Sequence, residues 1–165
     1  LQGKDTEGKG WVLRNSKGQY TLTLDGLKAG SLERKTPALE IQGDLTLVLK
    51  KGTESELLST DAALKKGAGT LTIRGEGSLR LQGETALEGE WKEETLNQDE
   101  PSALRIEGGK LVFTGEETAL YEDTVELAGG EIQIQCLNGK GTGIRAHTLD
   151  DRHFSGSLEM EESEE

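Results

Sequence analysis

The chain has 165 residues, 32% of them hydrophobic, and 19 Lys and Arg against 31 Asp and Glu give it a formal net charge of −12. We expect one domain over residues 1–165, because this length suffices for one buried core. The charge argues against nucleic acid as a partner. The lone Cys136 excludes an intramolecular disulfide, and no apolar run approaches the roughly 20 residues of a membrane span.

The first ten residues, LQGKDTEGKG, are polar. They lack the apolar stretch of a signal peptide, so we expect an exported protein whose signal peptide has been removed, located outside the cell or at its surface. Trp11 follows this segment, immediately before the first clear strand, and we expect it to cover the N-terminal end of the core. We expect the repeated fold to occupy residues 11–158 and an acidic tail to occupy 159–165.

Glycine-led segments with alternating apolar and polar residues recur along the chain. They lie at residues 18–26, 43–52, 69–83, 108–115 and 129–136. A period of two is typical of half-buried strands, and no segment shows a helical period over several turns. The sequence therefore predicts an all-β protein in which leucines and isoleucines point inward.

A second repeated word, Ala-Leu or its equivalent, favours a solenoid. Its first members are separated by 25, 23, 17, 16 and 24 positions, near the lower end of solenoid periods. A solenoid stacks the same position of each coil on the one before, whereas an antiparallel β-sandwich needs no repeated words. We predict a right-handed parallel β-helix of about six short coils, with a sandwich as the alternative. Its inward column would contain Leu39, Leu64, Leu87, Leu104, Leu120 and Ile144.

The residues that follow this column would form an outward row along the axis of the solenoid. The row would contain Glu40, Lys65, Glu88, Arg105, Tyr121 and Arg145. Charged side chains offer hydrogen bonds to sugar hydroxyls, Arg can pair with a uronate carboxylate, and a tyrosine ring can stack on a sugar. We take the row as a candidate glycan-binding surface. The alternative is a ladder of ion pairs on a solvated sheet.

Two irregular stretches hold the other candidate residues. Residues 89–102 break the alternation and are predicted to form an insertion loop, which carries Trp91 as a candidate sugar platform. The stretch HTLDDRHF at 147–154 places DDRH between two strands of the last coil. Asp150, Asp151 and His153 there are candidate calcium ligands, since loops often carry function and calcium prefers oxygen ligands. The alternative is a polar cap on the end of the solenoid.

The segments PALEIQGDLTLVLKKGTESEL, AALKKGAGTLTIRGEGSLRLQG, ALYEDTVELAGGEIQIQC and TGIRAHTL resemble bacterial secreted carbohydrate-binding-domain proteins. The resemblance covers roughly residues 18–158. It implies a right-handed parallel β-helix similar in fold to pectate lyases, and binding of plant cell-wall polysaccharides, including cellulose and acidic sugars, with calcium on the protein. The resemblance assigns no metal ligand to a position in this chain.

The sequence leaves three functions open. No Rossmann, P-loop, nucleophile-elbow, zincin or EF-hand signature is present, which favours a binding module over an enzyme. We expect a non-catalytic module for plant cell-wall or acidic polysaccharides that requires no cofactor and can be assisted by calcium. The first alternative is a structural spacer or adhesin segment of a cell-surface protein. The second is a polysaccharide lyase that uses Asp123, Asp150, Asp151, Arg145 and Arg152. The sequence does not indicate an oligomeric state.

Overall fold

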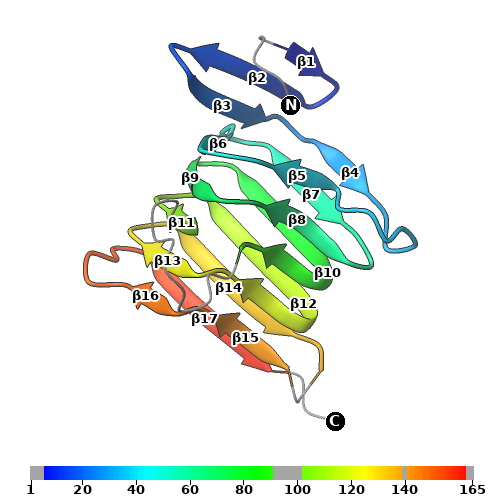
Figure 1. The fold of residues 1–165 in the computed structure, drawn as a ribbon, viewed down its shortest axis with the longest axis vertical. Helices are drawn as coiled ribbons and strands as arrows, with labels where there is room; N and C mark the ends of the chain where they lie inside the picture. Colours follow the sequence, from blue (N-terminus) through cyan, green and yellow to red (C-terminus); the bar gives the residue numbers. More distant parts are fainter. Residues whose placement is uncertain (1–5, 91–101, 139–140, 163–165) are drawn as a thin grey trace.

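A computed structural model describes residues 6–90, 102–138 and 141–162 and shows a parallel β-helix of about five turns (Figure 1). The predicted all-β solenoid is confirmed, and the described residues contain no helix. Among these residues, antiparallel pairing is confined to the N-terminal strands β1 (Thr6–Gly8), β2 (Trp11–Ser16) and β3 (Gln19–Leu24). The other strand pairs are parallel and in register, as stacked coils require and a sandwich does not.

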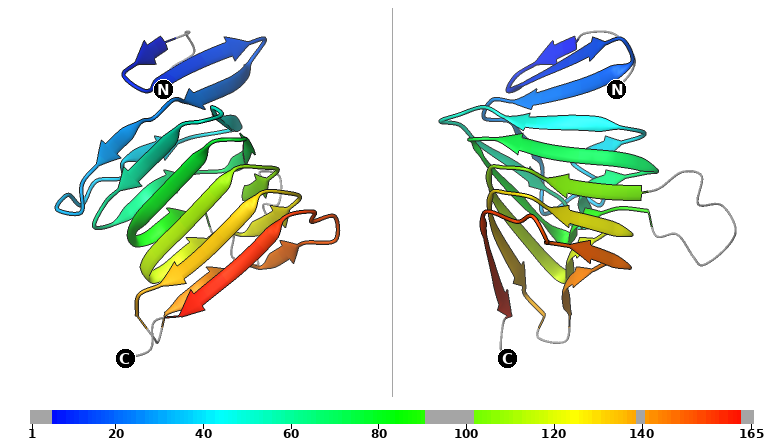
Figure 2. Two further views of the ribbon diagram at one scale, coloured as in Figure 1. Left: turned by 180° about the vertical axis from the view of Figure 1, so that it is seen from behind. Right: turned by 90° about the vertical axis from the view of Figure 1, so that its left-hand side faces the viewer.

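The strand pairings give the coils three faces. Figure 2 shows the stack of coils from two further directions. Face 1 contains β3 (Gln19–Leu24), β6 (Leu45–Leu49), β9 (Gly69–Gly75), β11 (Ser102–Ile106), β13 (Thr124–Leu127) and β16 (Thr148–Asp150). Face 2 contains β4 (Lys28–Gly30), β7 (Glu54–Leu58), the first parts of β10 (Ser78–Glu88) and β12 (Lys110–Tyr121), β14 (Glu131–Cys136) and β17 (Ser157–Glu162). Face 3 contains β5 (Leu39–Ile41), β8 (Ala62–Lys66), the second parts of β10 and β12, and β15 (Thr142–Arg145).

The apolar side chains of the alternating strands stack into ladders inside the coils. On face 3, the in-register pairs join Leu39, Leu64, Leu87, Leu120 and Ile144, as the repeated word predicts. On face 2, Phe113 lies between Leu81 and Ile134, and all three are at most 1% exposed. Burial of each such side chain contributes about 1.5–3 kcal/mol, so the ladders are the main stabilising feature of the fold.

The placement of Leu104 in the face 3 column is wrong. Leu104 lies on face 1, where it pairs with Leu71 and Val125 and is fully buried. The word at Ala103-Leu104 does not begin a new coil: the offsets of 17 and 16 together make the 33 positions between Leu87 and its partner Leu120. The insertion after β10 lengthens this one coil, so two apparent short repeats are one long one. The chain accordingly makes about five turns, not six.

Glycines allow the coils to approach closely at the corner between faces 1 and 2. Gly130 has φ 94°, a left-handed conformation that side chains other than glycine rarely adopt. A Cβ atom on Gly156, one coil later, would lie 1.8 Å from the carbonyl oxygen of Gly130. A side chain at this corner would therefore push successive coils apart, which explains why glycine introduces each strand of face 2 from β10 onward.

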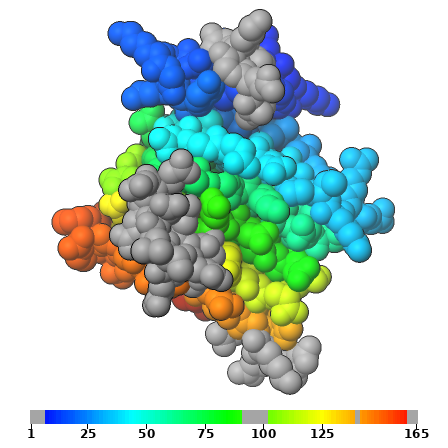
Figure 3. Space-filling model, in the orientation of Figure 1, coloured from blue at the N-terminus to red at the C-terminus, as the bar shows by residue number. Residues whose placement is uncertain are grey.

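The two ends of the solenoid differ. At the N-terminal end, β1 (Thr6–Gly8) and β2 (Trp11–Ser16) extend face 1, Leu13 is buried and Trp11 packs against the core, as predicted for that tryptophan. At the C-terminal end, Leu149 and Met160 continue the inward ladders but are 47% and 49% exposed. The space-filling view shows the coils between these ends as successive bands along the long axis (Figure 3).

Candidate functional site

The outward row of face 3 forms with five of its six predicted members. Cα pairing places Glu40 beside Lys65, Lys65 beside Glu88, Glu88 beside Tyr121, and Tyr121 beside Arg145. The described strands therefore carry charges of alternating sign along this face as far as Tyr121. The Arg145 guanidinium lies 5.6 Å from the centre of the Tyr121 ring, a cation–π contact. One side of the ring predicted to stack on sugar is thus already covered by protein.

Arg105 does not belong to this row. It lies on β11 of face 1, between Thr72 and Glu126, because it follows Leu104 in the misassigned coil. Its Nε atom lies 2.6 Å from Glu107 Oε2 and its Nη1 atom 2.5 Å from Glu126 Oε1. The hydrogen bonds to Glu107 and Glu126 raise the pKa of Arg105 above its usual value. Both carboxylates engage this guanidinium, which makes it an ion-pair link between two coils.

The DDRH stretch connects β16 and β17, as the sequence predicts for the last coil. Arg152 donates to both oxygens of Asp150, from Nε at 3.0 Å and from Nη2 at 2.8 Å. These hydrogen bonds lower the pKa of Asp150 to about 2. Asp151 and His153 are exposed neighbours of this pair. Among the residues that the structure describes, no group of three or more His, Cys, Asp or Glu side chains is arranged to hold a metal ion.

A histidine–aspartate pair lies at the corner between face 3 and face 1, where the chain passes from β15 to β16. Nδ1 of His147 hydrogen-bonds with Oδ1 of Asp123, and the backbone amides of His147 and Thr148 both donate to the Asp123 carbonyl oxygen, at 2.9 and 3.0 Å. The carboxylate therefore fixes the orientation of the imidazole ring. Four of the five residues named for a lyase are divided between this pair, the Asp150–Arg152 pair and the Arg145–Tyr121 contact, and the fifth, Asp151, is exposed beside the Asp150–Arg152 pair.

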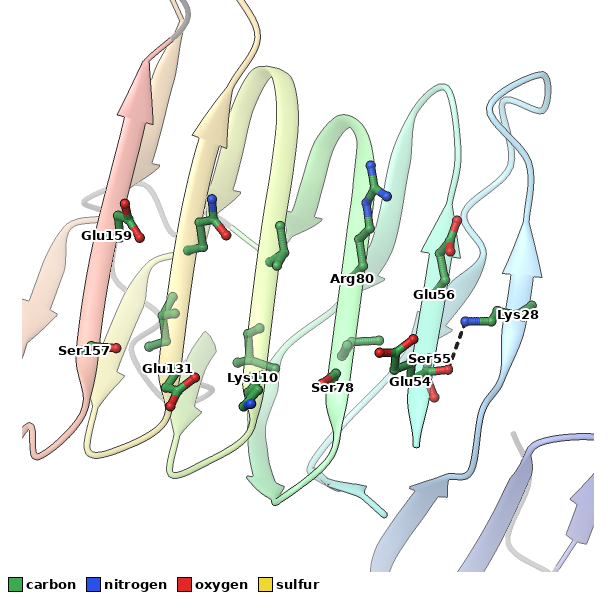
Figure 4. A pocket seen from close by; sticks show the side chains of 15 residues that line it. Lys28, Glu54, Ser55, Glu56, Ser78, Arg80, Lys110, Glu131, Ser157 and Glu159 are labelled. Atoms are coloured by element: carbon green, nitrogen blue, oxygen red, sulfur yellow. Dashed lines mark hydrogen bonds between the residues drawn. The ribbon is translucent and has the colours of Figure 1, made fainter. Parts of the chain in front are cut away.

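A polar groove runs across the outer side of face 2, roughly parallel to the axis of the solenoid, and has a volume of about 510 Å³ (Figure 4). It crosses β4, β7, β10, β12, β14 and β17. Its charged lining residues are Lys28, Glu54, Glu56, Arg80, Lys110, Glu131 and Glu159, with Ser78, Gln133 and Ser157 between them. Two in-register rows supply these side chains, so the groove follows from the stacking of the coils.

Val112 lies at the middle of this groove. Its neighbours across the strands are Arg80 and Gln133, and Lys110 precedes it by two positions on the same side of β12. Val112 belongs to the outward row that also contains Lys28, Glu56, Arg80, Gln133 and Glu159. Its side chain is shorter than theirs and apolar, so it forms the floor of the groove. Such a site offers one apolar contact surrounded by hydrogen-bonding groups.

A second groove, of about 390 Å³, lies on face 1 near the N-terminal end. Thr21, Thr46 and Thr72 stand in register along it on successive coils, and Asp44 and Arg74 are its charged members. This groove crosses three coils, so it is shorter than the groove of face 2.

Sequence reasoning missed a buried ionic cluster at the base of the insertion. Lys66 Nζ lies 2.8 Å from Glu122 Oε2, and both side chains are fully buried. Lys66 also donates to Ser102 Oγ at 2.9 Å and to the Gly69 carbonyl oxygen at 2.8 Å, while Ser102 Oγ donates to Glu122 Oε1 at 2.7 Å. The only sequence signal would have been Lys66 at an apolar position of the alternating strand Ala62–Lys66.

The cluster bridges the two strands that flank the end of β10. Lys66 ends β8 and Glu122 follows β12, and β10 pairs with both of these strands. A Cβ atom on Gly89, the residue after β10, would be 2.3 Å from the Glu122 carboxyl group, so a side chain at this position would clash with the pair.

Trp91, the remaining predicted ligand residue, lies outside the described residues. The described residues contain no helix long and apolar enough to cross a membrane.

In comparisons with known proteins, no family model matches the chain, and no curated protein or solved structure matches it.

Proposed function

We propose that this chain is a non-catalytic module that binds an extended polysaccharide along the groove of face 2. The observation that carries the proposal is the groove itself, which crosses six strands and presents donors and acceptors in register from coil to coil. Neighbouring strands are about 4.8 Å apart, so polar groups repeat at intervals comparable to the length of a sugar ring. A linear glycan can therefore meet similar partners along its whole length.

The lining of the groove suits a polysaccharide. The described residues that line it include Lys, Arg, Glu, Ser and Gln side chains, which supply both donors and acceptors. Polar side chains around a low apolar floor match the hydroxyl edges and C–H faces of a sugar. Plant cell-wall polysaccharides are the ligand class we propose, and a location outside the cell follows from that ligand. Calcium enters the proposal as a bridging ion for acidic glycans.

Binding of purified protein to cellulose, xylan and pectin, each with calcium and with chelator, tests the proposal. Val112→Arg places a long side chain on the floor of the groove and should abolish binding. Val48→Arg is the matched control, since Val48 is also a half-buried outward valine, on β6 of face 1, and lies outside both grooves. Retention of none of the three polysaccharides, or equal loss in both variants, would contradict the proposal.

A structural spacer is the second candidate, and one observation favours it. Outward side chains bind neighbours on their own face. Arg145 contacts Tyr121 on face 3, and on face 1 Arg105 forms ion pairs with Glu107 and Glu126. Such pairs give solubility and register without a ligand. A spacer would bind none of the three polysaccharides, and the lyase alternative would release unsaturated products from polygalacturonate that absorb ultraviolet light.

A further inference from the structure

We infer that the groove of face 2 selects a glycan in which a single acidic sugar is flanked by neutral sugars, and that it discriminates against polyuronates. This inference rests on the proposed function and adds the chemical class of the ligand. It follows from the order of charges along the groove, because Arg80 and Lys110 lie at the centre, carboxylates lie on both sides of them, and Lys28 lies at the N-terminal edge.

The centre of the groove is positive. Arg80 on β10 and Lys110 on β12 are both exposed and lie on either side of Val112 and Ser78. Adjacent strands are about 4.8 Å apart and alternate residues about 6.6 Å, so the two positions are about 8 Å apart on the diagonal. Arg80 Nη2 donates to Gln82 Oε1 at 2.9 Å, on the side of Arg80 away from Lys110. The Arg80 side chain therefore has to turn toward Val112 for both cations to meet one anionic group placed there. Guanidinium and ammonium groups form charge-assisted hydrogen bonds with carboxylates.

The flanks of the groove are negative. On the N-terminal side, Glu54 and Glu56 lie on β7, one coil from Arg80, and Lys28 beyond them donates to the Glu54 carbonyl oxygen at 2.9 Å. On the C-terminal side, Glu131 is the register neighbour of Lys110 on the next strand, and Glu159 lies one coil further (Figure 4).

The carboxylates set the limit on ligand charge. An acidic sugar at the centre gains two cations, whereas acidic sugars one or two residues away meet carboxylates of the same sign. Like charges at this spacing repel each other unless a cation lies between them. Each additional uronate along a chain therefore opposes binding, and a neutral chain lacks the central contact.

Isothermal titration with three hexasaccharides tests the inference: xylohexaose, xylohexaose carrying one internal glucuronate, and hexagalacturonate, all in chelator. We expect the singly acidic probe to bind about tenfold more tightly than the neutral probe, and hexagalacturonate to bind most weakly. The double variant Arg80→Gln/Lys110→Gln should bind the two xylose probes equally. Lys51→Gln/Arg74→Gln, exposed basic residues outside this groove, should retain the preference.

Three outcomes would overturn the inference. Equal binding of neutral and singly acidic probes by the wild-type protein would do so while leaving the proposed function standing. If the wild-type protein bound hexagalacturonate more tightly than the singly acidic probe, the flanking carboxylates would not act on the ligand. The inference predicts that the double variant Glu131→Gln/Glu159→Gln binds hexagalacturonate more tightly than the wild-type protein does. Binding of none of the probes would remove both the proposed function and the inference.

Discussion

Replacing Lys66 with methionine should destabilise the fold strongly, because it leaves a buried carboxylate without its cation. Glu122 would keep hydrogen bonds from Ser102 Oγ at 2.7 Å and from the Asp123 amide at 2.8 Å, but no positive charge would remain at the 2.8 Å distance of Lys66 Nζ. Removal of one partner from a buried ion pair costs about 3–5 kcal/mol. For a domain of this size, that corresponds to a fall in Tm of roughly 6–20 °C.

The double variant Lys66→Met/Glu122→Met separates this explanation from simple loss of packing. Apolar side chains of similar volume can replace a buried pair at little cost, since the desolvation of both charges is also removed. We expect the double variant to be more stable than Lys66→Met alone, as measured by urea unfolding followed by circular dichroism. A cost below about 1 kcal/mol for Lys66→Met, or additive costs in the double variant, would refute the reasoning.

Two further predictions concern the C-terminal coils. Arg152→Gln removes the hydrogen bonds that lower the pKa of Asp150, so this pKa should rise from about 2 toward 3.8 in an NMR titration. The pKa of Asp150 is lower in the folded state than in the unfolded state, so the Asp150–Arg152 pair stabilises the wild-type protein above about pH 4. This contribution is lost as the pH falls from about 4 to about 2. An unchanged pKa of Asp150 in the variant would contradict the assignment. Gly156→Ala should lower the Tm, since its Cβ would lie 1.8 Å from the Gly130 carbonyl oxygen, whereas Ser157→Ala at the next, exposed position should leave the Tm nearly unchanged.

The sequence predicts the solenoid because its evidence is local and repeated. Alternating leucines identify strands, and words such as Ala63-Leu64 and Ala86-Leu87 mark the same position in successive coils. The prediction from the sequence fails where a coil changes length. Ala103-Leu104 carries the same word on a different face, and no rule of spacing tells two short coils from one long coil with an insertion.

The groove and the buried pair depend on relationships that one strand does not show. Val112 becomes the floor of a site only because Arg80 and Gln133 stand beside it on strands 32 and 21 positions away. Lys66 is identified as buried only when Glu122 is placed against it, two coils later. The alternating pattern of face 2 indicates which side chains point outward, but the order of their charges along the axis requires the register of all the coils.

Titration of isotope-labelled protein with xylohexaose carrying one internal glucuronate, followed by two-dimensional NMR, tests the central claim most directly. The account predicts that the shifted amide signals gather on face 2, at β7, β10, β12 and β14, and are centred on Val112. Shifts that gather on face 1 or face 3, or no shifts at saturating probe, would contradict it.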